Sequence, residues 1–392
     1  MSSATTQHLL LSPAELAYLH GSLGLTPAVR PDGRSATQFR PLTAETDVLP
    51  GANGSARVCF ADGTEAVVGV KAEVSRRRAP ARVDQVYENK ELRRKSRDGK
   101  GKETEGGEKE GEKEEEDEES ERRKMGENDW VEITVEIPGY RDDDSSTVFL
   151  ATMLGEALLA DGDFTKKLWI NRRFHWKLYI DIILISPPLS YPLPLLSLTT
   201  HLALLATRLP RLKSEADEDP MFDDDWAASQ FIYPRQSSTS RPPITLLVMA
   251  VGDNIIFDPS KEELAVADSA LAVSVGETSA PPADEAMDVD DAAPGTGRNL
   301  RLLSVRTIDP PSRLTAPGVP NSVNAAAWSA QNGPETKDPG ARAAETDNVE
   351  GVWKAPRGGA KVSVLGAMVQ KVLEKGGVAE EVLEGLEAVD LG

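Results

Sequence analysis

The amino-acid sequence predicts a strand-rich α/β fold, a mixed sheet with packed helices, and three observations support it. Residues 55–61 and 64–74 are β-type runs joined by Asp62-Gly63, a strong hairpin signal because both residues of such a turn take positive φ. Residues 174–186 form a long apolar strand, and an almost uncharged helical segment follows them. Further strand-like runs occur at 243–251, 254–258, 264–275 and 300–308.

The first expected element is a helix that begins after Ser12. Ser12 caps it, Pro13 suits its first turn, and Glu15 occupies the third position of a capping box. The helix is expected to end at Leu23. A strand-like piece near 39–47 then precedes the hairpin.

Residues 76–128 differ sharply in composition from their surroundings. The segment 90–102 is basic, and Glu, Lys and Gly dominate 103–121. So polar a segment buries too little apolar surface to offset the entropy of ordering, so we expect a disordered insertion in a strand connection. It is either a solvated spacer or a charged tail that contacts RNA or protein.

The middle of the chain predicts a strand, a helix and two further strands. Residues 130–137 alternate as a strand does, and Asp144-Ser145-Ser146 caps a helix over 147–160. A short strand is expected at 168–172. Both faces of 174–186 are largely apolar, which places this strand centrally in a sheet. In the helix predicted over 147–160, the apolar face comprises Phe149, Leu150, Met153, Leu154 and Leu158.

The stretch 182–207 carries no formal charge and resembles a membrane span at first sight. Spanning a bilayer takes roughly 20 continuous helical residues. Four prolines divide this stretch, namely Pro187, Pro188, Pro192 and Pro194. We therefore predict the end of a buried strand and then a helix that is buried on most sides.

Low-complexity segments also interrupt the second half of the chain. Residues 276–297 are acidic and rich in Ala and Pro, and 309–360 is linker-like. Helices are expected at 361–374 and 378–389. The predicted organisation is an N-terminal helix in 1–29, one domain over 30–308 with insertions at 76–128 and 276–297, a linker over 309–360, and C-terminal helices of the same domain in 361–392.

The charge balance limits the classes of function. The formal net charge is −20 and the pI is about 4.8. Neutralising phosphates takes clustered Lys and Arg, so this chain is not expected to bind nucleic acid by itself. Contact with RNA would need a local basic patch or basic neighbours. The first residues have no basic region of the kind that opens a secretory signal.

The sequence predicts neither a cofactor nor a metal site. Cys59 is the one cysteine, so it makes no internal disulfide or thiolate-rich zinc site, and we expect a small buried apolar residue. The acidic triplets at 142–144 and 223–225 either hold a divalent cation or form turns and a helix N-terminus. His201, on the apolar helix, is expected to be a hydrogen-bonded packing residue.

Four basic residues are the candidates for RNA contact: Lys166, Lys167, Arg172 and Arg173. They lie among the aromatic residues Trp169, Phe174 and Trp176. Basic side chains interleaved with aromatic rings bind phosphates and stack on bases. The alternative is a strand edge that charge protects from pairing with another chain.

Several segments together resemble the RNase PH family. They are 30–34 (Arg-Pro-Asp-Gly-Arg) with 39–42 (Phe-Arg-Pro-Leu), the hairpin 55–74, and 174–211. Residues 176–181 and 186–191 narrow the resemblance to fungal forms of one ring subunit of the eukaryotic RNA exosome, in the group related to the archaeal non-catalytic ring partner. The resemblance covers most of the chain that is expected to be ordered, but not the three low-complexity segments 76–128, 276–297 and 309–360.

This resemblance implies the RNase PH fold and a place in a six-membered ring that threads RNA through a central channel. It implies partners: other RNase PH-like ring subunits, RNA-binding cap subunits, associated hydrolytic ribonucleases and RNA. It implies no membrane, and a location in the nucleus, the nucleolus and the cytoplasm. Active family members split the 3′ end of RNA with phosphate, which takes an anion cradle and a carboxylate that protonates the leaving oxygen.

The residues that active members need are not all present. Pro192-Leu193 stands where the cradle has Thr-Arg. Proline has no backbone N–H to donate and leucine has no charge, so neither residue can hold phosphate. Glu156 replaces a phosphate-side arginine. Asp258 matches one acid of the catalytic pair, but Leu264 takes the place of the other, so Asp258 is expected to be a structural turn or cap residue.

We therefore expect no catalytic residues and no enzymatic activity. The expected role is a structural ring subunit of the exosome that supports 3′-to-5′ RNA processing and degradation. Two alternatives stay open. One is an active phosphate-dependent exoribonuclease, and the other is a protein-binding domain of the same fold without a ring role.

Overall fold

The computed structural model describes residues 11–76, 126–141, 143–171, 173–214, 218–234, 241–277, 298–310, 312, 353–356 and 359–391. Most of the predicted insertions at 76–128 and 276–297, and most of the linker at 309–360, lie outside the described residues, as does Arg172.

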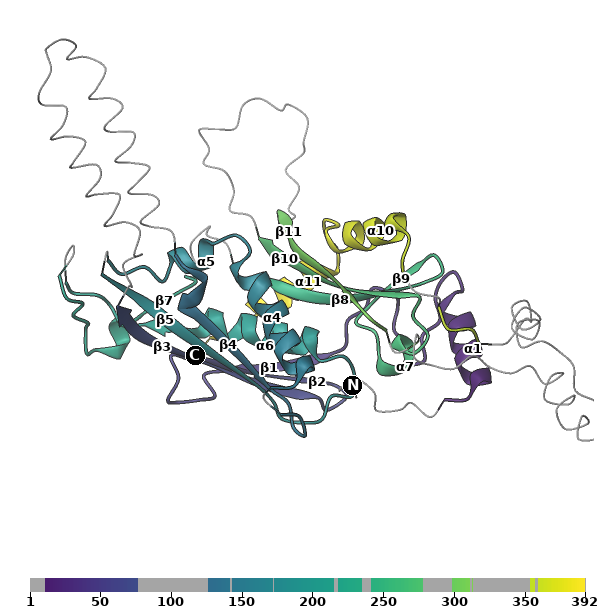
Figure 1. The fold of residues 1–392 in the computed structure, drawn as a ribbon, viewed down its shortest axis with the longest axis horizontal. Coiled ribbons are helices and arrows are strands. Elements are labelled where there is room, and N and C mark those ends of the chain that lie inside the picture. The colour runs from purple at the N-terminus through teal and green to yellow at the C-terminus, as the bar shows by residue number, and fades with distance from the viewer. Residues whose placement is uncertain are drawn as a thin grey trace, which may run out of the picture.

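Two main sheets form the framework (Figure 1). The first has the order β1-β2-β3-β5-β4, and its β4–β5 pair is parallel while its other pairs are antiparallel. The second is antiparallel with the order β11-β10-β8-β9, and β6 and β7 form a separate short pair. The predicted mixed sheet is thus confirmed. The strands are β1 (Leu42–Thr46), β2 (Gly54–Phe60), β3 (Glu65–Arg76), β4 (Val131–Glu136), β5 (Phe174–Leu184), β6 (Arg208–Leu209), β7 (Gln230–Phe231), β8 (Ile244–Val251), β9 (Asn254–Phe257), β10 (Ser269–Glu277) and β11 (Leu300–Ile308).

Helix α6 (Leu193–Ala206) lies between the two sheets, where it packs against β2 and β3 on one side and β8 on the other (Figure 1). All of its side chains are buried, as predicted. None of the described helices is long and apolar enough to span a bilayer. The other helices are α1 (Pro13–Leu23), α4 (Ser145–Leu159), α5 (Asp163–Lys166), α7 (Lys261–Leu264), α10 (Val362–Val372) and α11 (Val378–Glu387), with the 3-10 turns η1 (Asn128–Trp130) and η2 (Trp226–Ala228).

Local signals were right where the structure depends on neighbouring residues. The predicted capping box of α1 is present: the Glu15 amide donates to the Ser12 hydroxyl, and the Ser12 amide donates to the Glu15 carboxylate at 2.7 Å. Strand β11 has the predicted bounds. The acidic residue Asp144 caps α4 by accepting from the Ser146 amide.

The predicted two-residue turn at Asp62-Gly63 was wrong. The Phe60 amide donates to the Thr64 carbonyl at 2.9 Å, so three residues form the loop. Of these, Gly63 alone has a positive φ, +85°. A type I turn followed by a left-handed glycine closes such a loop, and Ala61 and Asp62 then stay in ordinary backbone regions.

Three other element predictions need correction. Residues 168–171 form no strand beyond an isolated bridge between Trp169 and His175, because the Leu168 and Trp169 amides donate to carbonyls at the end of α5. Residues 264–267 belong to α7 and the turn after it, and β10 begins only at Ser269. Helix α7 begins with a capping box between Ser260 and Glu263 that the sequence analysis did not predict.

Burial also differs from the prediction at several positions. Strand β5 has a neighbour on each edge, but only one of its faces is buried along its whole length, and the other is exposed at Asp181 and Ile183. Phe149, assigned to the apolar face of α4, is 43% exposed. Cys59 is only half-buried. Alternation within one strand shows which residues share a face, but not whether another layer covers that face.

Candidate functional site

Asp258, the residue that follows β9, lies between two arginines. Its Oδ2 accepts hydrogen bonds from Arg34 Nη1 at 2.8 Å and from the Nε and backbone amide of Arg40 at 2.8 and 3.0 Å. Its Oδ1 accepts from Arg40 Nη2 at 2.7 Å. The backbone has φ +46°, in the left-handed region that Asp and Asn tolerate better than most residues.

A second buried ion pair lies beside the first. Arg30 donates from Nε and Nη2 to the two carboxylate oxygens of Glu263, at 2.7 Å each, and both side chains are fully buried. Arg30 also donates to the carbonyls of Phe257 and Asp258. We call Arg30, Arg34, Arg40, Asp258 and Glu263 the arginine clasp. It joins the segment that carries the Arg-Pro-Asp-Gly-Arg motif to β9 and α7.

The clasp determines what Asp258 can do chemically. Of the four hydrogen bonds from Arg34 and Arg40, three end on Oδ2 and one on Oδ1, so both carboxylate oxygens are held by arginines. Its side chain is 1% exposed. Burial alone would lower the pKa of Arg40, but the hydrogen bond and charge of Asp258 raise it. Asp258 therefore serves as a structural anchor between two cations, whereas a general acid needs a proton to give and access to the substrate.

The first turn of α6 carries no cation. Pro192 is its N-cap residue and makes no side-chain capping bond, and the Leu193 side chain is fully buried. Burial also raises the pKa of the neighbouring Tyr191 hydroxyl. A helix N-terminus attracts anions through its free N–H groups, and Pro194 in this first turn has none to offer. The loss of the phosphate cradle stays a prediction from the family resemblance.

Glu156, on α4, does not stand alone. Its carboxylate makes two hydrogen bonds with the Arg306 guanidinium of β11, from Nε at 2.9 Å and from Nη2. Both side chains are partly exposed. The negative charge that the sequence places here is thus balanced by a strand residue 150 positions further on.

The candidate RNA-binding residues are engaged by groups of this chain. Lys166 pairs with Asp163 at 3.0 Å, and Arg173 pairs with Asp219 at 3.0 Å. The Lys167 ammonium lies 3.6 Å from the centre of the Tyr233 ring, and burial lowers its pKa to about 8. Arg172 lies outside the described residues.

The aromatic residues of this region pack internally. Trp176 is 8% exposed and contacts Phe222 with ring centres 4.9 Å apart. Trp169 packs against Trp130, which also stacks on His175 at 4.3 Å. Rings held in this way have limited area for stacking on bases. Sequence spacing did not reveal the Trp130–His175 stack, since these residues come from separate elements.

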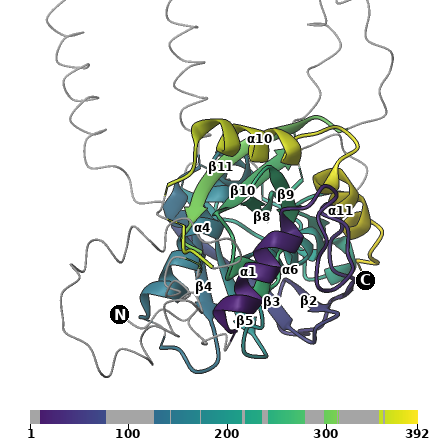
Figure 2. The same ribbon diagram turned by 90° about the vertical axis from the view of Figure 1, so that its right-hand side faces the viewer.

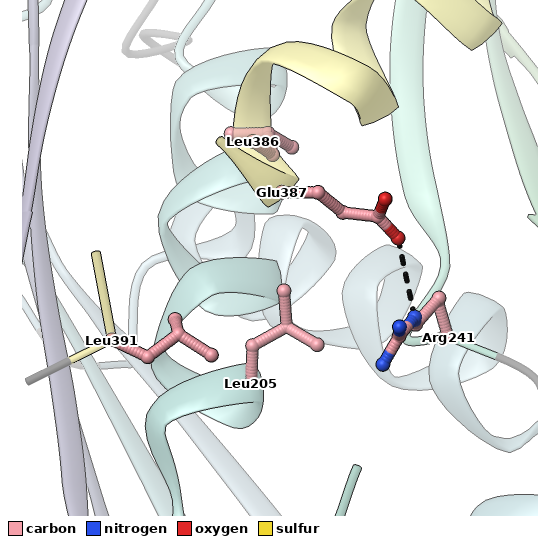
Figure 3. Close-up of a pocket in the computed structure, with 5 residues that line it drawn as sticks. All are labelled: Leu205, Arg241, Leu386, Glu387 and Leu391. Carbon is pink, nitrogen blue, oxygen red and sulfur yellow. Dashed lines mark ion pairs between the residues drawn. The ribbon is translucent and has the colours of Figure 1, made fainter. Parts of the chain in front are cut away.

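A small cavity of about 150 Å³ lies between α6 and α11 (Figure 3). Its lining includes Arg241, which pairs with Glu387 at 3.2 Å, and Arg298 also donates to Glu387 at 2.6 Å. The hydrogen bond from Arg298 lowers the pKa of Glu387. Leu205 and Leu391 supply apolar walls. The carboxylate is used to tie α11 to the neighbouring segments, and sequence reasoning had not identified this cluster.

Within the described part of the chain, no group of three or more His, Cys, Asp or Glu residues is placed to hold a metal ion. The acidic triplets have other uses there. Asp144 caps α4, Asp225 caps η2, and Asp223 pairs with Lys213 at 3.0 Å.

No family model matches the sequence. Curated relatives do match. The chain is 30% identical over 270 residues to the exosome complex component RRP42 of Saccharomyces cerevisiae, an alignment that covers 67% of this chain and 81% of that protein. The chain belongs to the RRP42 family. The Schizosaccharomyces pombe component rrp42 is 31% identical over 281 residues, which cover 68% and 78% of the two proteins. The predicted resemblance to an exosome ring subunit is thereby confirmed.

Solved structures show more distant similarity to this RRP42-family chain. A chain of the Archaeoglobus fulgidus exosome with RNA bound to the active site is 18% identical with a TM-score of 0.45, covering 75% of this chain and 86% of that one. A chain of an archaeal exosome core is 18% identical with a TM-score of 0.42, covering 75% of this chain and 84% of that one. These values are too low to transfer a site from one protein to the other.

Proposed function

We propose that this RRP42-family chain is a structural, catalytically inactive ring subunit of the RNA exosome. The observation that carries the proposal is the buried carboxylate of Asp258, both of whose oxygens are bound by Arg34 and Arg40. The apolar start of α6 supports it, because phosphorolysis needs a cationic or N–H-lined cradle for phosphate. The named relatives, which are exosome components, supply the assembly.

In this role the chain shapes the RNA channel and supports 3′-to-5′ processing and degradation, including rRNA maturation, RNA surveillance and mRNA turnover. Its partners are other RNase PH-like ring subunits, RNA-binding cap subunits and associated hydrolytic ribonucleases, and it acts in the nucleus, the nucleolus and the cytoplasm. A net charge of −20 supports a shared channel, since basic neighbours would supply most of the phosphate contacts.

Inactivity is tested with a 3′-labelled RNA, inorganic phosphate and the purified full-length chain. We expect no phosphate-dependent release of nucleoside diphosphates. Robust release that Asp258→Asn abolishes, in a variant whose fold is retained, would overturn the proposal. Ring membership is tested by affinity purification from the native organism. Recovery of the chain without any other exosome subunit would favour a protein-binding domain with no ring role.

RNA contact through Lys166, Lys167, Arg172 and Arg173 is part of the same proposal. Lys166 and Arg173 are about half exposed, at 51% and 49%, so a phosphate can compete for them with their acidic partners. In the assembled complex, the double variant Lys166→Ala/Arg173→Ala should lose roughly two phosphate contacts. The slope of log affinity for RNA against log salt concentration should become shallower by the amount that two contacts contribute. An unchanged slope and unchanged RNA crosslinking would remove these residues from the channel.

A further inference from the structure

One side of the molecule is built from β4, α4 and β11. β4 ends the five-stranded sheet, β11 ends the four-stranded sheet, and α4 packs against both. Figure 2 shows the three one above another, with α4 in the middle. We call this side the β4–α4–β11 face. Within the described residues each strand is paired along one edge only, and a free edge is a template for pairing with another chain.

A groove of about 450 Å³ runs between β4 and α4. Ile133 and Val135 line it from the strand, and Val148, Ala151 and Gly155 line it from the helix. Gly155 keeps it open, since a Cβ atom there would meet only the Ile133 Cδ1 atom, at 3.6 Å. An open apolar groove beside a free strand edge has the two features that strand addition needs, namely backbone groups and side-chain pockets.

Large apolar side chains are exposed on the same face. Val148 and Phe149 of α4 are 51% and 43% exposed. Scattered single residues of this kind are ordinary on protein surfaces, but residues grouped with a groove and free edges mark an interaction site.

The face is poor in net charge although the chain carries −20. The only charged side chain in α4 is Glu156, and Arg306 of β11 balances it. On β4, Glu132 pairs with Lys177, which leaves Glu136 beside the groove. Nucleic acid needs clustered cations, whereas the core of a protein interface is depleted in charge. These charges favour a protein occupant over RNA.

We propose that a neighbouring subunit of the exosome ring docks on the β4–α4–β11 face and adds an extended segment to the free edge of β4. This inference rests on the proposed function, because a ring subunit needs a neighbour on each side. Strand β4 has six residues and thus spans about 20 Å, so it pairs with a segment of about the same length. Alternate apolar side chains of that segment fill the groove, and Val148 and Phe149 make flanking contacts.

Gly155→Phe separates docking from folding. In a helix an aromatic side chain turns back over the preceding turn, so a phenylalanine at 155 lies over Ala151 and Thr152 and fills the groove. The groove has room for it, so the fold is retained. Gly155→Ala adds only a methyl group and is the matched control. Gly21→Phe places the same side chain on the exposed α1, where a Cβ atom meets nothing within 4 Å.

The experiment co-expresses the full-length chain with the other ring subunits of the same organism and measures assembly by size-exclusion chromatography and native mass spectrometry. We expect Gly155→Phe to weaken assembly roughly tenfold or more, while Gly155→Ala and Gly21→Phe assemble as the wild type does. Amide exchange in 131–136 should slow when the wild-type ring forms. Circular dichroism and thermal unfolding of the isolated chain confirm that each variant folds.

The outcomes distinguish the two levels of inference. If the wild type does not assemble with exosome subunits, the proposed function fails. If the wild type and Gly155→Phe assemble equally well and the β4 amides stay unprotected, the docking face is wrong while the function stands. Crosslinking of RNA to this face in the ring, in place of protein, would also overturn the docking proposal.

Discussion

Asp258→Asn removes the charge on which Arg34 and Arg40 converge but keeps the size of the side chain. Asn tolerates the φ of +46° at this position, so the backbone turn is preserved. The Arg34 and Arg40 side chains are 9% and 10% exposed, so the substitution takes one charged partner from each of two nearly buried cations, which keep Asp32 and Asp62 as their other partners. Removing one partner of a buried pair costs about 3–5 kcal/mol. The amide oxygen still accepts hydrogen bonds, so we expect the lower end, about 3 kcal/mol.

The assay is urea unfolding of the isolated full-length chain. The free energy of unfolding is compared with that of the wild type, provided that its slope against urea concentration is unchanged. Asp258→Ala should cost about 1 kcal/mol more, because alanine accepts no hydrogen bond and is strained at positive φ. Asp143→Asn is the control, since that carboxylate is 70% exposed and its pair with Arg141 contributes little. We expect the control to lie within about 0.5 kcal/mol of the wild type.

A loss below about 1 kcal/mol for Asp258→Asn would refute the clasp as a stabilising element. A double-mutant cycle with Arg40→Met adds a second check. Coupling between the two positions should be positive and of the order of 1–3 kcal/mol if they act as one network. Independent effects would mean that the four hydrogen bonds at Asp258 have little energetic weight.

Three further predictions concern burial. Burial lowers the pKa of His201 to about 4, so between pH 6.5 and 4 only the unfolded chain binds that proton, and stability relative to His201→Leu should fall by about 3 kcal/mol across this window in urea titrations. Lys167 has a pKa of about 8 for the same reason, so stability relative to Lys167→Met should rise between pH 8 and 10, and a flat difference would contradict this. Gly54→Ala puts a Cβ atom 2.5 Å from Thr207 Cα and should cost about 1–3 kcal/mol in thermal unfolding.

Features with local causes could be predicted from the sequence. The capping box at Ser12 and Glu15 depends on residues three apart, and the burial of α6 follows from its composition. The same reasoning was less reliable where a local pattern fits two structures. Residues 168–171 contain apolar residues that suit a strand, but the turn after α5 uses the Leu168 and Trp169 amides and leaves only one bridge, from Trp169 to His175. The Asp62-Gly63 turn gained one residue because Phe60 pairs with Thr64.

The candidate site could be predicted only in part. The sequence pointed to Asp258 and Pro192-Leu193, and the structure places Asp258 between two arginines and buries the Leu193 side chain. It did not indicate that Arg34 and Arg40 hold Asp258, because these residues are 224 and 218 positions apart from it. Side chains this distant meet only after two sheets have packed. The basic residues Lys166 and Arg173 were identified by type, but their acidic partners were not.

The sequence alone determined the strand-rich α/β class, the buried helix between prolines and the family resemblance, because hydrophobic periodicity, proline placement and motif order are written along the chain. Tertiary structure decided which carboxylates are already engaged, which face of β5 is open, and which sheet edges are left unpaired. Those properties depend on packing between elements far apart in the chain. The arginine clasp and the β4–α4–β11 face therefore appear only once the two sheets and α4 are assembled.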